Sequence, residues 1–141
     1  MLLVLVDNVD EDVTWIKFNY NQVGYYRVNY ESDMWKSLTE VLIENPNSMS
    51  ILDRAHLLND AFSLAEAREL NFEVALDMTR FLNRETSFVP WETGAGKIKS
   101  IKNLLYYTPV YTKFRKYAVE LVDKAFASLD YLVDPAENLR K

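Results

Sequence analysis

Residues 50–67, SILDRAHLLNDAFSLAEA, decide the fold of this chain, because they contain the strongest helix signal in its 141 residues. Ser50 is followed three residues later by Asp53, an arrangement that resembles the capping box found at helix starts. Apolar residues then recur at helical spacing in one stripe: Ile51, Ala55, Leu58, Phe62 and Ala65, flanked by Leu57 and Leu64. The pattern predicts an amphipathic helix from Ser50 to about Ala67.

A second helix is predicted just before this one. It begins near Ser32, the expected N-cap, and Asp33 lies in its first turn beside the positive end of the helix dipole. Trp35, Leu38 and Leu42 fall on one face at helical spacing. The sequence Asn-Pro-Asn at residues 45–47 ends this helix.

Three further helices are predicted after residue 67. The third helix covers about residues 71–82, and the fourth has Pro90 in its first turn, where a missing N–H costs nothing, and stops before Pro109. The fifth runs from about Val110 to residues 134–135. Because the connections are short, neighbouring helices should pack antiparallel, an arrangement that also suits the start of an α-solenoid.

The first thirty residues carry strand signals instead. Residues 2–6 form a short apolar run, and residues 14–20 and 25–30 alternate apolar and polar side chains. Residues 21–24 read as a turn in which Gly24 supplies a conformation costly for other residues. The predicted fold is therefore mainly α with a small β portion. That portion is either the end of a larger sheet or a small hairpin that covers the helices.

Composition excludes several classes of function. The chain has no cysteine, which excludes disulfides, thiolate nucleophiles and cysteine-based zinc sites, and its net charge of −5 argues against general binding of a phosphate backbone. The apolar run at residues 2–6 meets Asp7 too early for the core of a secretion signal. No stretch approaches the roughly 20 apolar residues of a membrane span, so we expect a soluble piece.

A search for catalytic motifs predicts no catalytic, cofactor-binding or metal-binding residue. His56 is the single histidine and is expected to be a surface or boundary residue, because catalytic zinc needs three protein ligands. The carboxylate pairs Glu66/Glu69 and Asp7/Asp10 are expected to be solvated. The stretch at residues 93–98 lacks the first glycine and the Ser/Thr of a phosphate loop, which predicts a helix weakened by two glycines.

A basic and aromatic stretch covers residues 97–117. It contains five lysines and one arginine, with Tyr106, Tyr107, Tyr111 and Tyr117 interleaved. Such a composition can bind single-stranded nucleic acid by stacking and phosphate contacts. Because these tyrosines occur at helical spacing, we expect most of them in the core or at its boundary, and a charged helix face without nucleic-acid binding.

Three segments together resemble one family. Residues 15–30, with Trp-Ile-Lys-Phe-Asn and Gly-Tyr-Tyr-Arg-Val-Asn-Tyr, residues 53–62, Asp-Arg-Ala-His-Leu-Leu-Asn-Asp-Ala-Phe, and residues 75–91, ending Phe-Val-Pro-Trp, resemble the aminopeptidase N family of zinc metallopeptidases in its membrane-bound and secretory-pathway branch. The resemblance covers about residues 13–122. It implies a fragment in which residues 1–31 are the last strands of a β-sandwich domain and residues 32–141 the first helices of a superhelical domain.

The same resemblance indicates what this chain lacks. The family binds zinc with His-Glu-x-x-His and a downstream Glu, holds the substrate's amino terminus with Gly-x-Met-Glu-Asn and uses a catalytic tyrosine, and no such motif occurs here. No catalytic residue is therefore carried over, and the chain alone is predicted to be inactive. The resemblance implies zinc and peptide substrates for the parent enzyme, and partners in its catalytic and β domains.

Two kinds of protein remain open from the sequence. The first is the non-catalytic part of an aminopeptidase that helps to enclose the substrate cavity, in a parent at the extracellular face of the plasma membrane or in the secretory pathway. The second is a stand-alone helical module that binds a peptide or protein without catalysis. For both we expect no nucleic-acid binding and no membrane contact by this segment.

Overall fold

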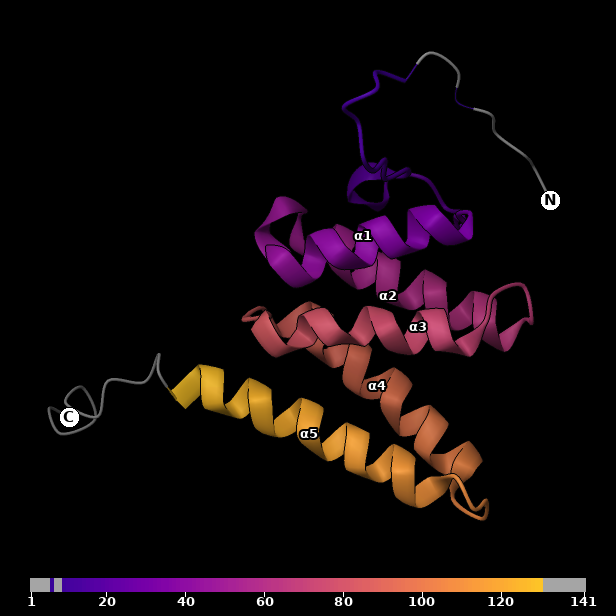
Figure 1. Cartoon of the computed structure of the whole chain (residues 1–141), viewed down its shortest axis with the longest axis vertical. Helices are drawn as coiled ribbons and strands as arrows, with labels where there is room; N and C mark the ends of the chain where they lie inside the picture. Colours follow the sequence, from indigo (N-terminus) through magenta and orange to yellow (C-terminus); the bar gives the residue numbers. More distant parts are fainter. Residues whose placement is uncertain (1–5, 7–8, 131–141) are drawn as a thin grey trace, which may run out of the picture.

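Five α-helices dominate the chain, of which the computed structural model describes residue 6 and residues 9–130. The helices are α1 (Ser32–Glu44), α2 (Ile51–Glu66), α3 (Phe72–Met78), α4 (Phe88–Leu105) and α5 (Tyr111–Asp130), and they follow one another through the molecule (Figure 1). There are also three short 3-10 helices: η1 (Tyr20–Gln22) precedes α1, η2 (Pro46–Ser48) lies between α1 and α2, and η3 (Thr79–Arg84) continues α3. The five predicted helices are confirmed, although the predicted end of the fifth at residues 134–135 lies outside the described residues.

Side-chain caps begin α2 and α3, whereas α1 and α4 start without a side-chain cap bond. The Ser50 side chain accepts a hydrogen bond from the Asp53 amide at 3.1 Å, which confirms the predicted start of α2. The Asn71 side chain caps α3 in the same way, accepting from the Glu73 amide at 2.9 Å. Ser32 was the predicted N-cap of α1. It is instead the first residue of that helix. Glu31 occupies the N-cap position without a side-chain cap bond.

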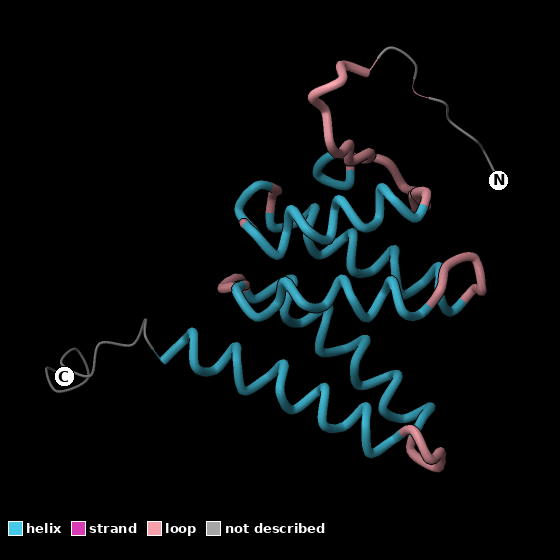
Figure 2. Tube along the Cα trace, viewed as in Figure 1, coloured by secondary structure: helices cyan, strands magenta, loops and turns pink. Residues whose placement is uncertain are grey.

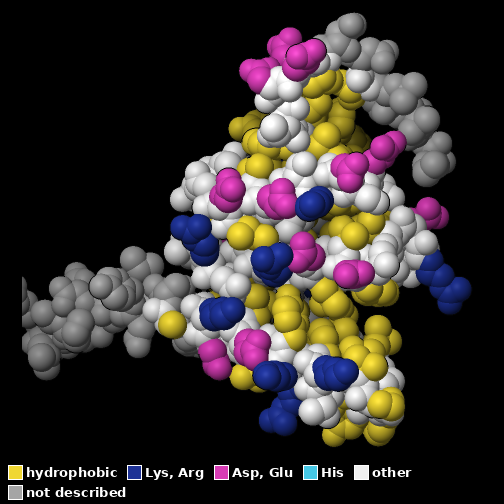
Figure 3. Space-filling view, viewed as in Figure 1, with side chains coloured by type: hydrophobic (Ala, Val, Ile, Leu, Met, Phe, Trp, Pro, Cys, Tyr) yellow, Lys and Arg dark blue, Asp and Glu magenta, His cyan; other side chains and the backbone are white. Residues whose placement is uncertain are grey.

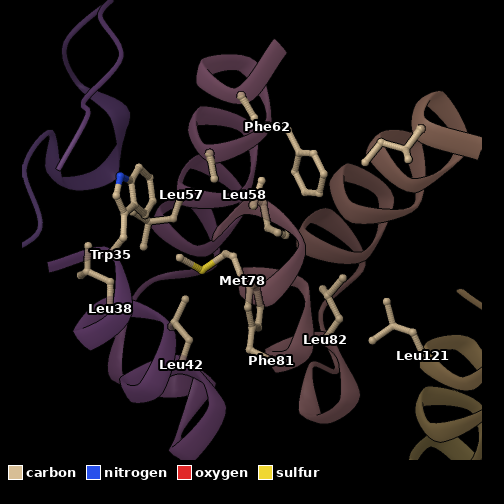
Figure 4. Close-up of a cluster of buried hydrophobic side chains, with 14 of the residues drawn as sticks. Trp35, Leu38, Leu42, Leu57, Leu58, Phe62, Met78, Phe81, Leu82 and Leu121 are labelled. Carbon is tan, nitrogen blue, oxygen red and sulfur yellow. The ribbon is translucent and has the colours of Figure 1, made fainter. Parts of the chain in front are cut away.

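The core lies where α1, α2, α3 and η3 meet, and α4 and α5 close it from the other side. α2 packs against both α3 and α4, while η3 packs against both α1 and α5. Trp35, Leu42, Phe62 and Phe81 are fully buried in this core (Figure 4). Of the predicted stripe of α2, Ile51 is an exception, because it is 45% exposed at the first turn of the helix.

Gly94 is a buried residue of α4, and its surroundings leave no room for a side chain. The helix is continuous from residue 88 to residue 105. A Cβ atom added at Gly94 would lie 2.5 Å from Cδ1 of Leu82, whereas one added at Gly96 would meet nothing within 4 Å. Gly94 therefore allows α4 to approach η3 closely, and only Gly96 fits the simpler prediction of a glycine that weakens the helix.

The two strands predicted at residues 14–20 and 25–30 are absent from the described part of the chain (Figure 2). Their backbone groups bind side chains instead of a neighbouring strand: the Phe18 amide donates to the Tyr30 hydroxyl at 3.0 Å and the Val28 amide to Asp60 at 3.0 Å. An isolated pair of strands is marginal in water, and side chains of the segment itself and of α2 take these backbone bonds here. Residues 2–5 of the predicted first strand lie outside the described residues.

The turn at residues 19–24 owes its shape to asparagine and glutamine, not to glycine as predicted. Asn19, Asn21 and Gln22 have φ values of 55°, 53° and 57°, whereas Gly24 has no positive φ. The Asn19 side chain stabilises the turn, because its amide donates to the Gly24 carbonyl at 2.8 Å and its oxygen accepts from the Gly24 amide at 2.7 Å. Asparagine tolerates the left-handed region better than most residues do.

Candidate functional site

A buried charge cluster joins the N-terminal segment to α2. It consists of the buried Asp53, His56 and Asp60 on α2 with the buried Lys17 and the half-exposed Arg27 from the segment before α1. Residues 53, 56 and 60 are spaced three and four apart, which places them on one face of the helix. Asp53 and Asp60 are each only 1% exposed, so both carboxylates need partners inside the protein.

Asp53 binds the first part of the segment. Its Oδ1 lies 2.6 Å from the Lys17 ammonium and accepts the Asn21 amide at 2.9 Å, while Oδ2 accepts the Ser50 hydroxyl at 2.8 Å. Burial alone would raise the pKa of Asp53, but the bonds from Lys17 and Ser50 outweigh that effect and lower it below its ordinary value. The Lys17 ammonium also donates to the carbonyl groups of residues 18 and 19.

Asp60 binds the second part of the segment, two turns further along α2. It accepts the Arg27 guanidinium at 3.2 Å and the Val28 amide at 3.0 Å. Nε2 of His56 lies 3.2 Å from the same carboxylate. Together, Asp53 and Asp60 fix the segment to α2 at two points, which positions everything that precedes α1 relative to the helices.

His56 is buried, with 9% of its surface exposed, so its predicted place at the surface or boundary is wrong. Burial lowers the pKa of His56 below its ordinary value, with Lys17 and Arg27 acting in the same direction, and Asp60 and Asp53 oppose the shift. The imidazole is therefore neutral at pH 7. It lies beside a single carboxylate that is already bound by Arg27 and a backbone amide.

A second buried ion pair lies on the adjacent side of α2. The Arg54 guanidinium binds Glu85 in a bidentate manner, with distances of 2.5 and 2.9 Å, and both side chains are almost fully buried. Arg54 also donates to the carbonyl groups of Pro46 and Met49 at 3.1 and 2.6 Å. Glu85 accepts the amides of residues 86 and 87 just before α4, so this pair connects the α1–α2 turn, α2 and the start of α4.

These buried charges all have structural partners within the protein. Within the described residues no group of three His, Cys, Asp or Glu side chains could hold a metal ion, so the donor set does not fit catalytic zinc. Glu66 and Glu69 are exposed, as predicted, and so is Asp10, while Asp7 lies outside the described residues. Lys97 lies within α4 and donates to the Ser63 hydroxyl at 3.3 Å, which agrees with a helix instead of a phosphate loop.

The sequence alone did not identify Lys17, Arg27 and Glu85 as partners of α2. The spacing of Asp53, His56 and Asp60 was the available signal, because three ionisable residues on one helix face beside an apolar stripe indicate buried pairing. The four tyrosines of the basic stretch differ in burial. Tyr111 and Tyr117 are partly buried as predicted, whereas Tyr106 and Tyr107 are exposed, contrary to the prediction. No helix in the described part is both long and apolar enough to span a membrane.

The fold and this cluster define an all-helical domain of antiparallel helices, stacked in chain order and joined to a preceding segment by buried charges. Comparison with known proteins identifies which domain it is. Residues 15–141 match the ERAP1-like C-terminal domain, and the chain belongs to this family. The resemblance to the aminopeptidase N family is thereby confirmed.

Several aminopeptidases are similar to the chain over most of its length. It is 34% identical to glutamyl aminopeptidase of Bitis rhinoceros over 122 residues and 36% identical to aminopeptidase N of Oryctolagus cuniculus over 118 residues. It is also 36% identical to the thyrotropin-releasing hormone-degrading ectoenzyme of Rattus norvegicus over 118 residues. These alignments cover 84 to 86% of the chain but only 11 to 13% of the relatives' length.

Proposed function

We propose that the chain is a non-catalytic part of a zinc-dependent aminopeptidase that removes N-terminal residues from peptides. The observation that carries this proposal is the similarity to named aminopeptidases over 84 to 86% of the chain, within a family defined by their C-terminal domain. Residues 1–31 would then be the end of a β-sandwich domain and residues 32–141 the first part of a helical domain.

The non-catalytic role is supported by the chemistry of the side chains. The sequence contains one histidine and no His-Glu-x-x-His motif. Asp53, Asp60 and Glu85, the buried carboxylates among the described residues, are all bound by cations or amides. Zinc would be held elsewhere in the parent, where such an ion lowers the pKa of bound water. The residues of this chain would contribute shape and position instead.

That contribution centres on the buried charge cluster. Residues 17–28 would belong to the preceding domain, and Asp53 and Asp60 fix them to the helices that follow. Two attachment points two turns apart along α2 restrict rotation as well as separation. In the parent enzyme this junction would set the angle at which the helical domain encloses the substrate cavity, and the partners would be the catalytic and β domains of the same polypeptide.

The parent would act on peptides at the extracellular face of the plasma membrane or in the secretory pathway. One relative is named as an ectoenzyme, which supports this location. We expect no nucleic-acid binding and no membrane contact by this segment.

The decisive experiment is to sequence the parent transcript outward from both ends of this segment. An upstream, in-frame His-Glu-x-x-His with a downstream Glu is expected. A start codon at Met1 with a stop after Lys141 would instead leave a stand-alone helical binding module. As a second test, the purified 141-residue chain should hydrolyse no aminoacyl anilide and retain no stoichiometric zinc. Zinc-dependent turnover above background would contradict the non-catalytic role.

A further inference from the structure

The end of the α4–α5 hairpin carries a surface that the proposed function does not use. We call it the hairpin surface and define it by Leu104, Tyr106, Tyr107 and Val110 around the turn, with Lys102 before it and Lys113 after it. In the space-filling view, apolar and basic side chains gather over this end of the hairpin, and acidic ones lie further along α5 (Figure 3).

The charge of this region is opposite to that of the rest of the chain. Six basic residues and no acidic residue occur in residues 97–116, although the whole chain has a net charge of −5. No Asp or Glu occurs at all between Glu92 and Glu120. Lys116 contacts Glu120 only at 3.8 Å, and no ion pair within the described residues involves Lys99, Lys102, Lys113 or Arg115. The surface is therefore an unneutralised cationic patch.

Exposed aromatic and aliphatic side chains lie in the middle of this patch. Tyr107 is 94% exposed, Leu104 70% and Tyr106 53%. The ring of Tyr106 packs edge-on against Tyr107 at 4.9 Å and lies 5.1 Å from Tyr111. These contacts bring three tyrosine rings together at the turn, while Lys102 and Lys113 lie within three residues of the two helix ends.

The position of this surface at a turn would leave it accessible if the helical stack continued beyond α5. In a stack of helices each pair is covered on its faces by its neighbours, whereas the turns lie along an edge of the stack. The hairpin surface is formed by a turn and the adjoining helix ends. Further helices packed against α5 would leave it open.

We infer that the hairpin surface binds a sulfated polysaccharide of the glycosaminoglycan class. Sulfate groups are permanent anions that match the unpaired lysines, and the apolar face of a pyranose ring packs on a tyrosine ring. The choice of this polyanion rests on the proposed function, because an enzyme outside the cell meets sulfated glycans and not nucleic acid. Leu104 and Val110 would pack against the sugar backbone beside the tyrosines.

The experiment uses the complete 141-residue chain and defined heparin oligosaccharides. Binding is measured by isothermal titration calorimetry and heparin-affinity chromatography at several salt concentrations, with chemically desulfated heparin as the ligand control. The wild-type chain should bind heparin at physiological salt and should not bind the desulfated form. Each cation lost from the contact should lower the slope of log Kd against log salt by about one.

Matched variants distinguish binding at this site from non-specific electrostatic binding to any cationic surface. Lys113→Glu should weaken binding by about tenfold or more, whereas Lys36→Glu, the same charge change at an exposed site on α1, should have little effect. Tyr107→Ala should also weaken binding, and Tyr107→Phe should retain it, while circular dichroism reports the fold of every variant.

Four outcomes would overturn the assignment. They are no binding at physiological salt, equal losses for Lys113→Glu and Lys36→Glu, an unchanged affinity in Tyr107→Ala, and stronger binding to a single-stranded oligonucleotide or to phosphatidylserine vesicles than to heparin. None of them bears on the aminopeptidase assignment, which depends on the parent sequence and on catalysis elsewhere.

Discussion

Replacing Arg54 by leucine should be among the most damaging single changes in this chain. The substitution removes five hydrogen bonds: two to Glu85, two to the carbonyl groups of residues 46 and 49, and one to Ser87. It also leaves the Glu85 carboxylate, which is 1% exposed, without its counter-ion. Removing one partner of a buried ion pair costs about 3–5 kcal/mol, mainly because the remaining charge is uncompensated.

The loss can be measured by urea unfolding of the purified chain. With a slope of about 2 kcal/mol/M for a protein of this size, the midpoint should fall by about 2 M. Since the total stability of a domain is about 5–15 kcal/mol, this loss is a large fraction of it. Arg80→Leu is the matched control, because it breaks the Arg80–Asp77 pair, whose side chains are 56% and 46% exposed. That change should cost no more than about 1 kcal/mol.

The double variant Arg54→Leu/Glu85→Leu tests the reason for the loss. If the uncompensated charge dominates, removing the carboxylate as well should restore part of the stability lost in Arg54→Leu. If Arg54→Leu lowers the midpoint no further than Arg80→Leu does, the Arg54–Glu85 pair does not hold the helices together and the reasoning is refuted.

Three further predictions concern packing, pH and the junction. Gly94→Ala should destabilise the chain by about 1–3 kcal/mol in thermal or urea unfolding, because the added Cβ would meet Leu82. Gly96→Ala, where the added Cβ meets nothing, should stabilise the chain by about 0.5–1 kcal/mol. Equal effects of the two substitutions would exclude close packing at Gly94. Because burial lowers the folded-state pKa of His56, the folded state binds fewer protons than the unfolded state. The stability that neutral, buried His56 contributes to the fold is complete above pH 6.5, and it is lost as the pH falls below that value. In urea unfolding at pH 7 and pH 5, His56→Gln should lose less stability than the wild type, and parallel losses would contradict the shift. Asp60→Asn should speed hydrogen exchange at the amide that Asp60 binds and spare the amide bound by Asp53, and Asp53→Asn should do the reverse; an identical pattern in both variants would argue against two separate attachment points.

The helices could be predicted because their signals are local. The Ser50–Asp53 cap, the proline at residue 90 and the apolar spacing of α1 and α2 act within a few residues, and the structure follows them. The strand prediction was wrong because strand formation depends on partners that are not local in the sequence. Alternation at residues 14–20 and 25–30 describes side chains suited to a sheet, but a strand also needs a neighbour, and here side chains of Tyr30 and Asp60 take the backbone bonds.

The candidate site was harder to predict because its partners are distant in sequence. His56 and Asp60 were visible as ionisable residues, but whether a helix face is solvated or buried depends on what packs on it. Lys17, 36 residues before Asp53, and Glu85, 31 residues after Arg54, decide that question. A single sequence gives no pairing between such positions, so the local pattern predicted a surface or boundary position for His56.

Buried charge at this junction also serves a purpose that apolar packing would not. Apolar contacts tolerate sliding, because their energy depends on area and not on direction. Asp53 and Asp60 each accept one particular backbone amide and one cation, so moving the segment by one residue along α2 would leave two buried carboxylates and two amides without partners. The penalty for a shifted register is thus larger than the net gain from the correct one. In the parent enzyme that we propose, this penalty would fix the register in which the preceding domain joins the helices, and the charges on α2 would supply it.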